Sequence, residues 1–180
     1  MRIEALPLAG AALIRLEPRA DERGWFARSF CVRSLAAHGL HAEYPQHNIS
    51  FNRRAGTLRG LHFQLSPHEE VKIISCTRGR IFDVLVDLRP GSATYGQWHG
   101  AELSAENHDR LYAPAGFAHG FQTLSDDAEV HYLMGCEYVD GAAAGIRHDD
   151  PTLSIPWPLP VSAISERDLA LPTLTKALAR

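Results

Sequence analysis

The chain has 180 residues, of which 45% are hydrophobic and 22% charged, and its formal net charge is −3. This length and composition suit a globular protein with a sizeable core, which excludes a disordered chain, and we expect a single domain over residues 1–180. The small net charge leaves no basic stripe for a polyphosphate backbone, so we expect no nucleic-acid partner.

No apolar run is long enough to span a membrane, and the apolar stretch at residues 9–13 is too short and too poorly flanked for a secretion signal. We therefore expect a cytoplasmic protein with no membrane partner. Three cysteines, Cys31, Cys76 and Cys136, show no CxxC spacing. They predict neither a disulfide framework nor a zinc site, and we interpret them as packing residues.

Short apolar runs separated by turn residues, the pattern of β-strands, make up most of the chain. In chain order, strands are predicted at residues 26–30, 46–51, 58–64, 71–77, 80–88, 96–103, 110–113, 119–124 and 129–138. Alternation is clearest in two of them. In 80–88, one face carries Phe82, Val84, Val86 and Leu88, and in 129–138 one face carries Val130 and every second residue to Tyr138.

Helical signals are few. Ser34 is a candidate N-cap for a short helical turn over residues 35–39, and residues 173–179 predict a terminal helix. The proline-rich segment 155–160 is unsuited to a central strand and is expected to wrap the surface. Many short strands with no 20–50-residue repeat predict an all-β jelly roll or related closed barrel, whose interior can hold one small ligand.

The predicted strand at 58–64 carries the first candidate for chemistry. His62 and Gln64 lie two residues apart, on one face of the strand, and His62 is the natural candidate for a catalytic base, although an isolated strand histidine is more often a hydrogen-bonded core residue. Strict alternation places Arg59 on the opposite face. Gly60 between them predicts a bulge that re-aims one of the two side chains.

The segment 113–121 carries a second histidine. Its Pro114-x-Gly116-x-x-His119 spacing matches the second motif of cupin barrels, which aims a histidine into the barrel. Metal-binding cupins also need two histidines and a glutamate in their first motif. Here Gln64 takes the place of one histidine and Glu69 or Glu70 would have to supply the acid; because glutamine is a poor ligand beside imidazole, we expect no metal.

The chain as a whole resembles the dTDP-4-dehydrorhamnose 3,5-epimerase family of nucleotide-sugar epimerases, and the resemblance covers nearly its whole length. The matching blocks, in the family's order, are DERGWF (21–26), QHNIS (46–50), LRGLHFQ (58–64), EVKII (70–74), GRIFDVLVDLR (79–89), SATYGQW (92–98), LSAEN (103–107), LYAPAGFAHGF (111–121), DDPTLSIPWP (149–158) and ISERD (164–168).

The resemblance implies a homodimeric, cupin-type barrel without cofactor or metal, acting on a 4-keto-6-deoxy sugar linked to a nucleoside diphosphate. The reaction removes a proton next to the C4 ketone and returns one from the opposite face, at C3, at C5 or at both. Such chemistry needs a base, an acid on the other face and a cation for the developing oxyanion.

The resemblance also assigns residues to these roles. His62 matches the base, Asp168 the carboxylate that orients it, Tyr132 the acid, and Lys72 the cation near O4. Without the resemblance, Tyr132 reads as a core aromatic, Lys72 as a surface lysine and Asp168 as a solvated acid. The residues matched to nucleotide and diphosphate binding are Arg59, His119, Phe26, Gln46 and Asn48, with Arg23 supplied by the partner subunit.

Two departures from the family bear on specificity. The chain has Leu133-Met134-Gly135 after Tyr132, where the family usually continues with lysine and threonine, so which carbons are inverted stays open. Arg28 stands where the family commonly has a glutamate near the nucleobase. Arginine cannot accept a hydrogen bond from thymine, so we hypothesise a different nucleotide, such as GDP or CDP.

Three functions remain in competition. The first is the 3,5-epimerase, and the second is a relative that inverts one centre or shifts the ketone along the ring. The third is a cupin that only binds a sugar or a metal. Retention of a base, an acid and an oxyanion cation together favours an enzyme, an isomerase of the carbohydrate epimerase type.

Overall fold

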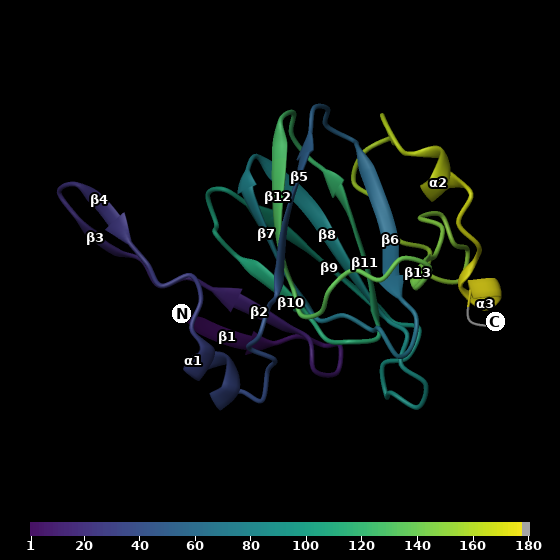
Figure 1. The fold of residues 1–180 in the computed structure, drawn as a ribbon. Coiled ribbons are helices and arrows are strands. Elements are labelled where there is room, and N and C mark those ends of the chain that lie inside the picture. The colour runs from purple at the N-terminus through teal and green to yellow at the C-terminus, as the bar shows by residue number, and fades with distance from the viewer. Residues whose placement is uncertain (178–180) are drawn as a thin grey trace.

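The computed structural model describes residues 1–177, which form two antiparallel sheets that face each other (Figure 1). In spatial order, the first sheet contains β1 (Arg2–Ala5), β2 (Ala12–Arg15), β10 (Arg110–Ala113), β7 (Lys72–Arg78), β12 (Ala128–Met134) and β5 (Gln46–Asn52). The second contains β13 (Ala143–Gly145), β6 (Leu58–Gln64), β11 (Phe117–Thr123), β8 (Arg80–Asp87) and β9 (Trp98–Ser104). The predicted all-β jelly-roll fold is confirmed.

The inward faces of the two sheets form the main apolar core. It is built from alternate positions of the strands, as a half-buried strand requires, and includes Leu13, Ile74, Leu85, Leu111, Phe121 and Val130. Tyr132 packs against the edge of this core. The apolar core therefore occupies one part of the barrel interior, and polar side chains line the part where β5, β6, β11 and β12 come together.

Strand β8 is buried on both of its faces. Its outer face carries Val84, Val86 and Leu88, which pack in a second cluster against Leu153, Ile155, Leu174 and Ala177 from the end of the chain. The predicted shared face is confirmed, but it is not the barrel interior. The interior face instead carries Ile81, Asp83, Leu85 and Asp87, all fully buried.

Three short helices flank the barrel: α1 (Val32–Ala37), α2 (Glu166–Leu169) and α3 (Leu174–Ala177). The predicted N-cap at Ser34 is wrong, because α1 begins one turn earlier after Cys31 and has no side-chain cap. Ser165 does cap α2, where its hydroxyl accepts from the Asp168 amide. The predicted terminal helix is confirmed from Leu174 to Ala177, and its remainder lies outside the described residues.

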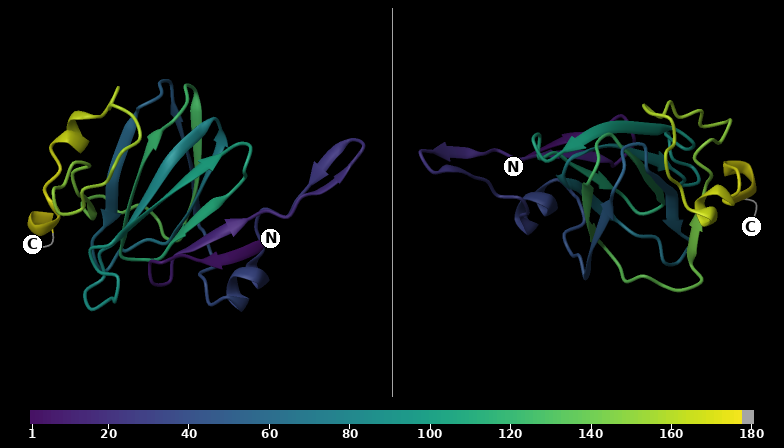
Figure 2. Two further views of the ribbon diagram at one scale, coloured as in Figure 1. Left: turned by 180° about the vertical axis from the view of Figure 1, so that it is seen from behind. Right: turned by 90° about the horizontal axis from the view of Figure 1, so that it is seen from above.

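The N-terminal region differs most from the sequence prediction. Strands β1 and β2 were not predicted. The strand predicted at 26–30 is wrong, because residues 27–30 form no strand and the extended backbone lies earlier, in a hairpin of β3 (Arg19–Asp21) and β4 (Gly24–Phe26). This hairpin projects from the barrel, as the views in Figures 1 and 2 agree. Trp25 is 51% and Phe26 76% exposed on it.

Other differences are smaller. Strand β12 ends at Met134 rather than Tyr138, because the Gly135 amide bonds to the carbonyl of Val71 and the chain turns away. The segment 155–160 forms no strand, as expected. All three cysteines are free, with only Cys76 fully buried. Within residues 1–177, every helix is too short to cross a membrane.

Candidate active site

His62 and Asp168 meet at the wall of the barrel. His62 lies on β6 and its Nε2 is 2.7 Å from Oδ1 of Asp168, which the Ser165-capped helix α2 holds in place. The Gly60 amide donates to the other carboxylate oxygen at 3.1 Å. Asp168 is 4% exposed, whereas the His62 side chain is 42% exposed and faces the cavity. The pair predicted from sequence is therefore in contact.

The carboxyl group of Asp168 is held in its ionised form. Burial opposes ionisation, but the hydrogen bond and charge of His62, together with the Gly60 amide, outweigh it and lower the pKa of Asp168 below its usual value. An ionised Asp168 accepts the Nε2 proton of His62. This fixes the tautomer of the ring and leaves Nδ1 as the nitrogen that can take a proton.

A register shift in β6 brings Arg59 to the same cavity as His62. In the pairing with β11, His62 lies opposite His119, but Arg59 lies opposite Phe121, so one extra residue is absorbed between them. Gly60 has φ +108°, and a Cβ on it would lie 2.7 Å from the backbone of β11. The predicted bulge is confirmed, and only glycine fits its close approach.

The cavity itself has a volume of about 290 Å³, at the lower limit of typical small-molecule pockets. Its lining residues come from both sheets: Asn48, Ile49, Ser50, Arg59, His62, Glu70, Lys72, His119, Phe121, Tyr132 and Met134. A second hollow of about 170 Å³ shares several of these residues and adds Gln46, Gln64, Tyr138 and Arg167. The two hollows therefore adjoin beside β5 and β6.

Tyr132 lines this cavity together with His62. Its ring packs edge to face on that of His119, with centroids 5.9 Å apart. Burial raises the pKa of Tyr132, and the carboxylate of Asp83 raises it further, while Ser50 and Arg59 oppose the shift. The phenol is therefore protonated at neutral pH, which is the state an acid must have before it delivers a proton.

Lys72 is a buried lysine, 5% exposed, so its interpretation as a surface residue is wrong. Its Nζ lies 2.5 Å from Oε1 of Glu70, and Gln64 donates to Oε2 of the same carboxylate at 3.2 Å. Glu70 therefore pairs with Lys72. Among residues 1–177, no group of three or more histidines, cysteines, aspartates or glutamates is arranged to hold a metal ion.

His119 has a carboxylate partner that sequence reasoning missed. Its Nε2 lies 2.7 Å from Oδ1 of Asp83, and Asp83 is fully buried on the interior face of β8. Burial raises the pKa of Asp83, against the opposing charges of His119 and Lys72. An acid inside an otherwise apolar strand was the available signal, because such a group needs a partner. Ser50, Phe121 and Arg167 were also missed.

The predicted nucleotide-binding residues fall into two groups. Asn48 and Gln46 lie beside the cavity, and Gln46 accepts a hydrogen bond from the Tyr138 amide at 2.8 Å. Arg23, Phe26 and Arg28 do not line the cavity of their own chain. The hairpin carries Arg23 outward, 84% exposed and paired with Asp21, and Phe26 and Arg28 line a separate hollow beside Glu17.

Comparison with known proteins gives consistent matches. The family model described as dTDP-4-dehydrorhamnose 3,5-epimerase matches residues 5–176. An enzyme of that name from Sinorhizobium fredii is 42% identical over 97% of this chain and 90% of its own. A dTDP-4-dehydrorhamnose 3-epimerase from Streptomyces niveus is 39% identical over 93% of this chain and 81% of its own.

A solved structure matches the fold over almost the full chain. It is dTDP-6-deoxy-D-glucose-3,5-epimerase from Legionella pneumophila in complex with dTDP-4-keto-L-rhamnose. The match has a TM-score of 0.92 at 37% identity, and covers 99% of this chain and 95% of the other. The barrel described above is thus the cupin-type barrel of these enzymes.

Proposed function

Because the chain belongs to the dTDP-4-dehydrorhamnose 3,5-epimerase family, we propose that it inverts C3 and C5 of a dTDP-linked 4-keto-6-deoxyhexose. One observation carries the proposal. The His62–Asp168 pair, Tyr132 and Lys72 all meet at a single cavity. The chain is thus an isomerase with a base, an acid and a cation in reach of one sugar ring, in a single catalytic domain.

His62 removes the proton. Its Nε2 is committed to Asp168, so Nδ1 takes the proton from the carbon next to the ketone, and the Asp168 carboxylate stabilises the imidazolium that forms. The electron pair moves into the C4 carbonyl and gives an enolate. Lys72, buried beside the cavity, stabilises the negative charge on O4.

Tyr132 returns a proton. Its phenol is protonated and lines the same cavity, so it delivers the proton to the face of the enolate opposite His62. A new proton on the opposite face inverts the carbon. His62 then releases its proton to solvent and Tyr132 takes one up, and repetition at the carbon on the other side of the ketone gives the second inversion. The scheme uses no cofactor and no metal.

The nucleoside diphosphate is held by residues from two chains. Arg59 and His119 lie in the cavity and bind the diphosphate, and Gln46 and Asn48 flank the nucleotide. The β3–β4 hairpin, which carries Arg23 and Phe26, projects from the barrel (Figure 1), and neither these residues nor Arg28 just after it line the cavity of their own chain, so they serve the site of a second copy in a homodimer. The exposed aromatic side chains on this hairpin support such a docking role. A cytoplasmic location and the absence of membrane and nucleic-acid partners stay predictions.

A second candidate is inversion at C3 alone. One relative is named as a 3-epimerase and matches nearly as well as the 3,5-epimerases. In this chain the apolar Met134 lines the cavity two residues after Tyr132. This side chain borders the substrate, and its size affects how closely each carbon approaches the phenol.

Proton NMR after incubation with dTDP-4-keto-6-deoxyglucose in D₂O tests the proposal. We expect deuterium at C3 and C5 and inverted product. His62→Ala should abolish exchange, whereas the exposed control His68→Ala should retain it. Deuterium at C3 alone would establish the single-centre reaction. No exchange with wild-type protein would overturn the enzyme assignment, and faster turnover of GDP- or CDP-linked sugars would overturn only the nucleotide.

A further inference from the structure

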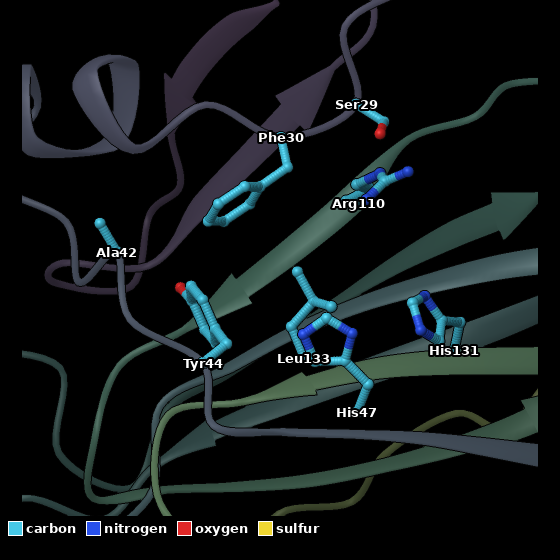
Figure 3. A pocket seen from close by; sticks show the side chains of 8 residues that line it. All are labelled: Ser29, Phe30, Ala42, Tyr44, His47, Arg110, His131 and Leu133. Atoms are coloured by element: carbon cyan, nitrogen blue, oxygen red, sulfur yellow. The ribbon is translucent and has the colours of Figure 1, made fainter.

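A further cavity, distinct from the hollows described above, lies on the outer face of the six-stranded sheet, outside the barrel. It has a volume of about 320 Å³, and its lining residues are Ser29, Phe30, Ala42, Tyr44, His47, Arg110, His131 and Leu133 (Figure 3). His47 and His131 are sequence neighbours of Asn48 and Tyr132. Because successive strand residues point to opposite faces, the two histidines face away from the sugar site.

The cavity has two chemically distinct sides. Figure 3 shows Phe30, Tyr44 and Ala42 together at one end, and Arg110 and Ser29 at another, with the two histidines beside Leu133. The apolar end also contacts a small core cluster that includes Leu35 and Tyr112. The cavity therefore offers an aromatic surface next to a group of nitrogen donors.

Arg110 is a cation without a compensating anion in residues 1–177. Its Nε is fully buried and has no hydrogen-bond partner there, and its guanidinium forms no ion pair with any described acid. The partial burial of Arg110 lowers its pKa below the usual value. A buried polar nitrogen without a partner is costly, and a planar guanidinium is best satisfied by an oxyanion that bonds to two of its nitrogens.

The two histidines add ring nitrogens to this side of the cavity. Their rings pack edge to face with centroids 5.8 Å apart. Burial lowers the pKa of His131, and the charges of His47 and Arg110 lower it further. Glu129 on β12 is the acid that opposes this shift, but it does not line the cavity, and its carboxylate accepts a hydrogen bond from Thr77.

The lining residues include no carboxylate, and β7, which lies between β10 and β12, contributes only the neutral Ser75 near His131. We propose that this cavity binds a small oxyanion, a phosphate or carboxylate, that carries an apolar group. Arg110 and the histidines hold the oxyanion, and Phe30 and Tyr44 pack on the apolar group. This site is separate from the sugar site and does not depend on the proposed reaction.

Calorimetric titration with phenyl phosphate tests the proposal. Arg110→Gln should weaken binding by at least about tenfold, because it removes the charged bidentate donor. The exposed control Arg78→Gln should bind like wild type. Arg59→Gln should also bind like wild type, which separates this cavity from the sugar site. Inorganic phosphate alone should bind more weakly than phenyl phosphate.

A second measurement is independent of how well the variant folds. In wild-type protein, the His47 and His131 ring protons should shift on addition of phenyl phosphate, because both rings line the cavity. The proposal is overturned if wild type does not bind, if Arg110→Gln binds equally well, or if only Arg59→Gln loses binding. The proposal would also be overturned if Arg110→Gln changed the self-association of the protein but left the binding of phenyl phosphate unchanged.

Discussion

The carboxylate of Asp168 lies 2.7 Å from Nε2 of His62, although the two residues are 106 positions apart in the sequence. The contact leaves Nδ1 of His62 as the only ring nitrogen free to act as a base. It also makes the ionisation of Asp168 a requirement for the reaction, because only the carboxylate accepts from Nε2 and stabilises the imidazolium.

Asp168→Asn should therefore reduce deuterium exchange at the sugar by a factor on the order of 10² to 10⁴. The amide keeps the shape of the side chain but cannot stabilise a positive ring. Exchange followed by NMR measures the effect. Asp149→Asn, at an exposed acid paired with Arg147, is the matched control and should leave exchange unchanged. Exchange above a tenth of the wild-type rate in Asp168→Asn would contradict the role.

Tyr132→Phe should affect inversion more than proton removal. The ring that packs on His119 is kept, but the proton donor is lost, so inverted product should fall by about 10² to 10⁴. Because the pKa of Tyr132 lies above its ordinary value of about 10, wild-type kcat should show no loss from phenol ionisation below that pH. A pH–rate profile together with product NMR checks both points, and equal loss of exchange and inversion would argue against a donor role.

Variants of Lys72 and Glu70 should show that the stability of the protein and its activity depend on this pair in different ways. Lys72→Met leaves Glu70 buried without its cation, and we expect a loss of about 3 kcal/mol in the free energy of unfolding. The double variant Glu70→Gln/Lys72→Met should recover most of this stability, because no unpaired charge remains. Both variants should stay nearly inactive. Urea unfolding and NMR assays measure the two effects, and activity that recovered with stability would show that Lys72 has only a structural role.

Variants at Arg23 and at His62 should complement each other when they lie on the two different chains of one dimer. An Arg23→Ala homodimer should bind substrate weakly, and a His62→Ala homodimer should be inactive. A heterodimer of the two has one intact site and should regain about half of the wild-type activity. Co-expression with two different tags isolates it. A heterodimer no more active than the Arg23→Ala homodimer would mean that the hairpin does not serve the partner's site.

Asp87 should contribute to stability in a pH-dependent way. Burial of its carboxyl would raise the pKa, but hydrogen bonds from Arg89, Ser92 and Thr94 hold it well below its usual range. Its contribution is therefore present above the unfolded pKa of about 4 and is lost as the pH falls toward the folded pKa.

Asp87→Asn should accordingly lower the free energy of unfolding by about 3 kcal/mol at neutral pH, and by less at about pH 3. Urea unfolding at several pH values measures the difference. A difference that did not change with pH would show that the carboxylate charge is not the source of the stability.

The sequence located the centre of the site because its residues lie in contiguous motifs. His62 and His119 stand on predicted strands, and Gly60 explained why Arg59 joins them, whereas the roles of Tyr132 and Lys72 came from the resemblance. Asp168 could be matched only through the resemblance, since no local pattern reports a contact across 106 residues.

The strands and residues that the sequence did not predict depend on tertiary structure. The four residues of β1 and of β2 are too few to show a period, and β2 is buried on both faces, so neither strand has an alternating pattern. Asp83 was overlooked because an apolar strand with both faces buried looks the same whichever face is inside. The sequence also did not predict that the β3–β4 hairpin projects from the barrel (Figure 1), because no local pattern reports how far a segment lies from the sheets.

The C-terminal segment both packs on the barrel and positions a side chain of the candidate site. Its residues from Leu153 to Ala177 cover the outer face of β8, and the same segment delivers Asp168 to His62. Removal of residues 153–177 would expose this face and take the carboxylate away from the imidazole. The strands of both sheets precede this segment, so such a truncation should abolish catalysis before it unfolds the sheets.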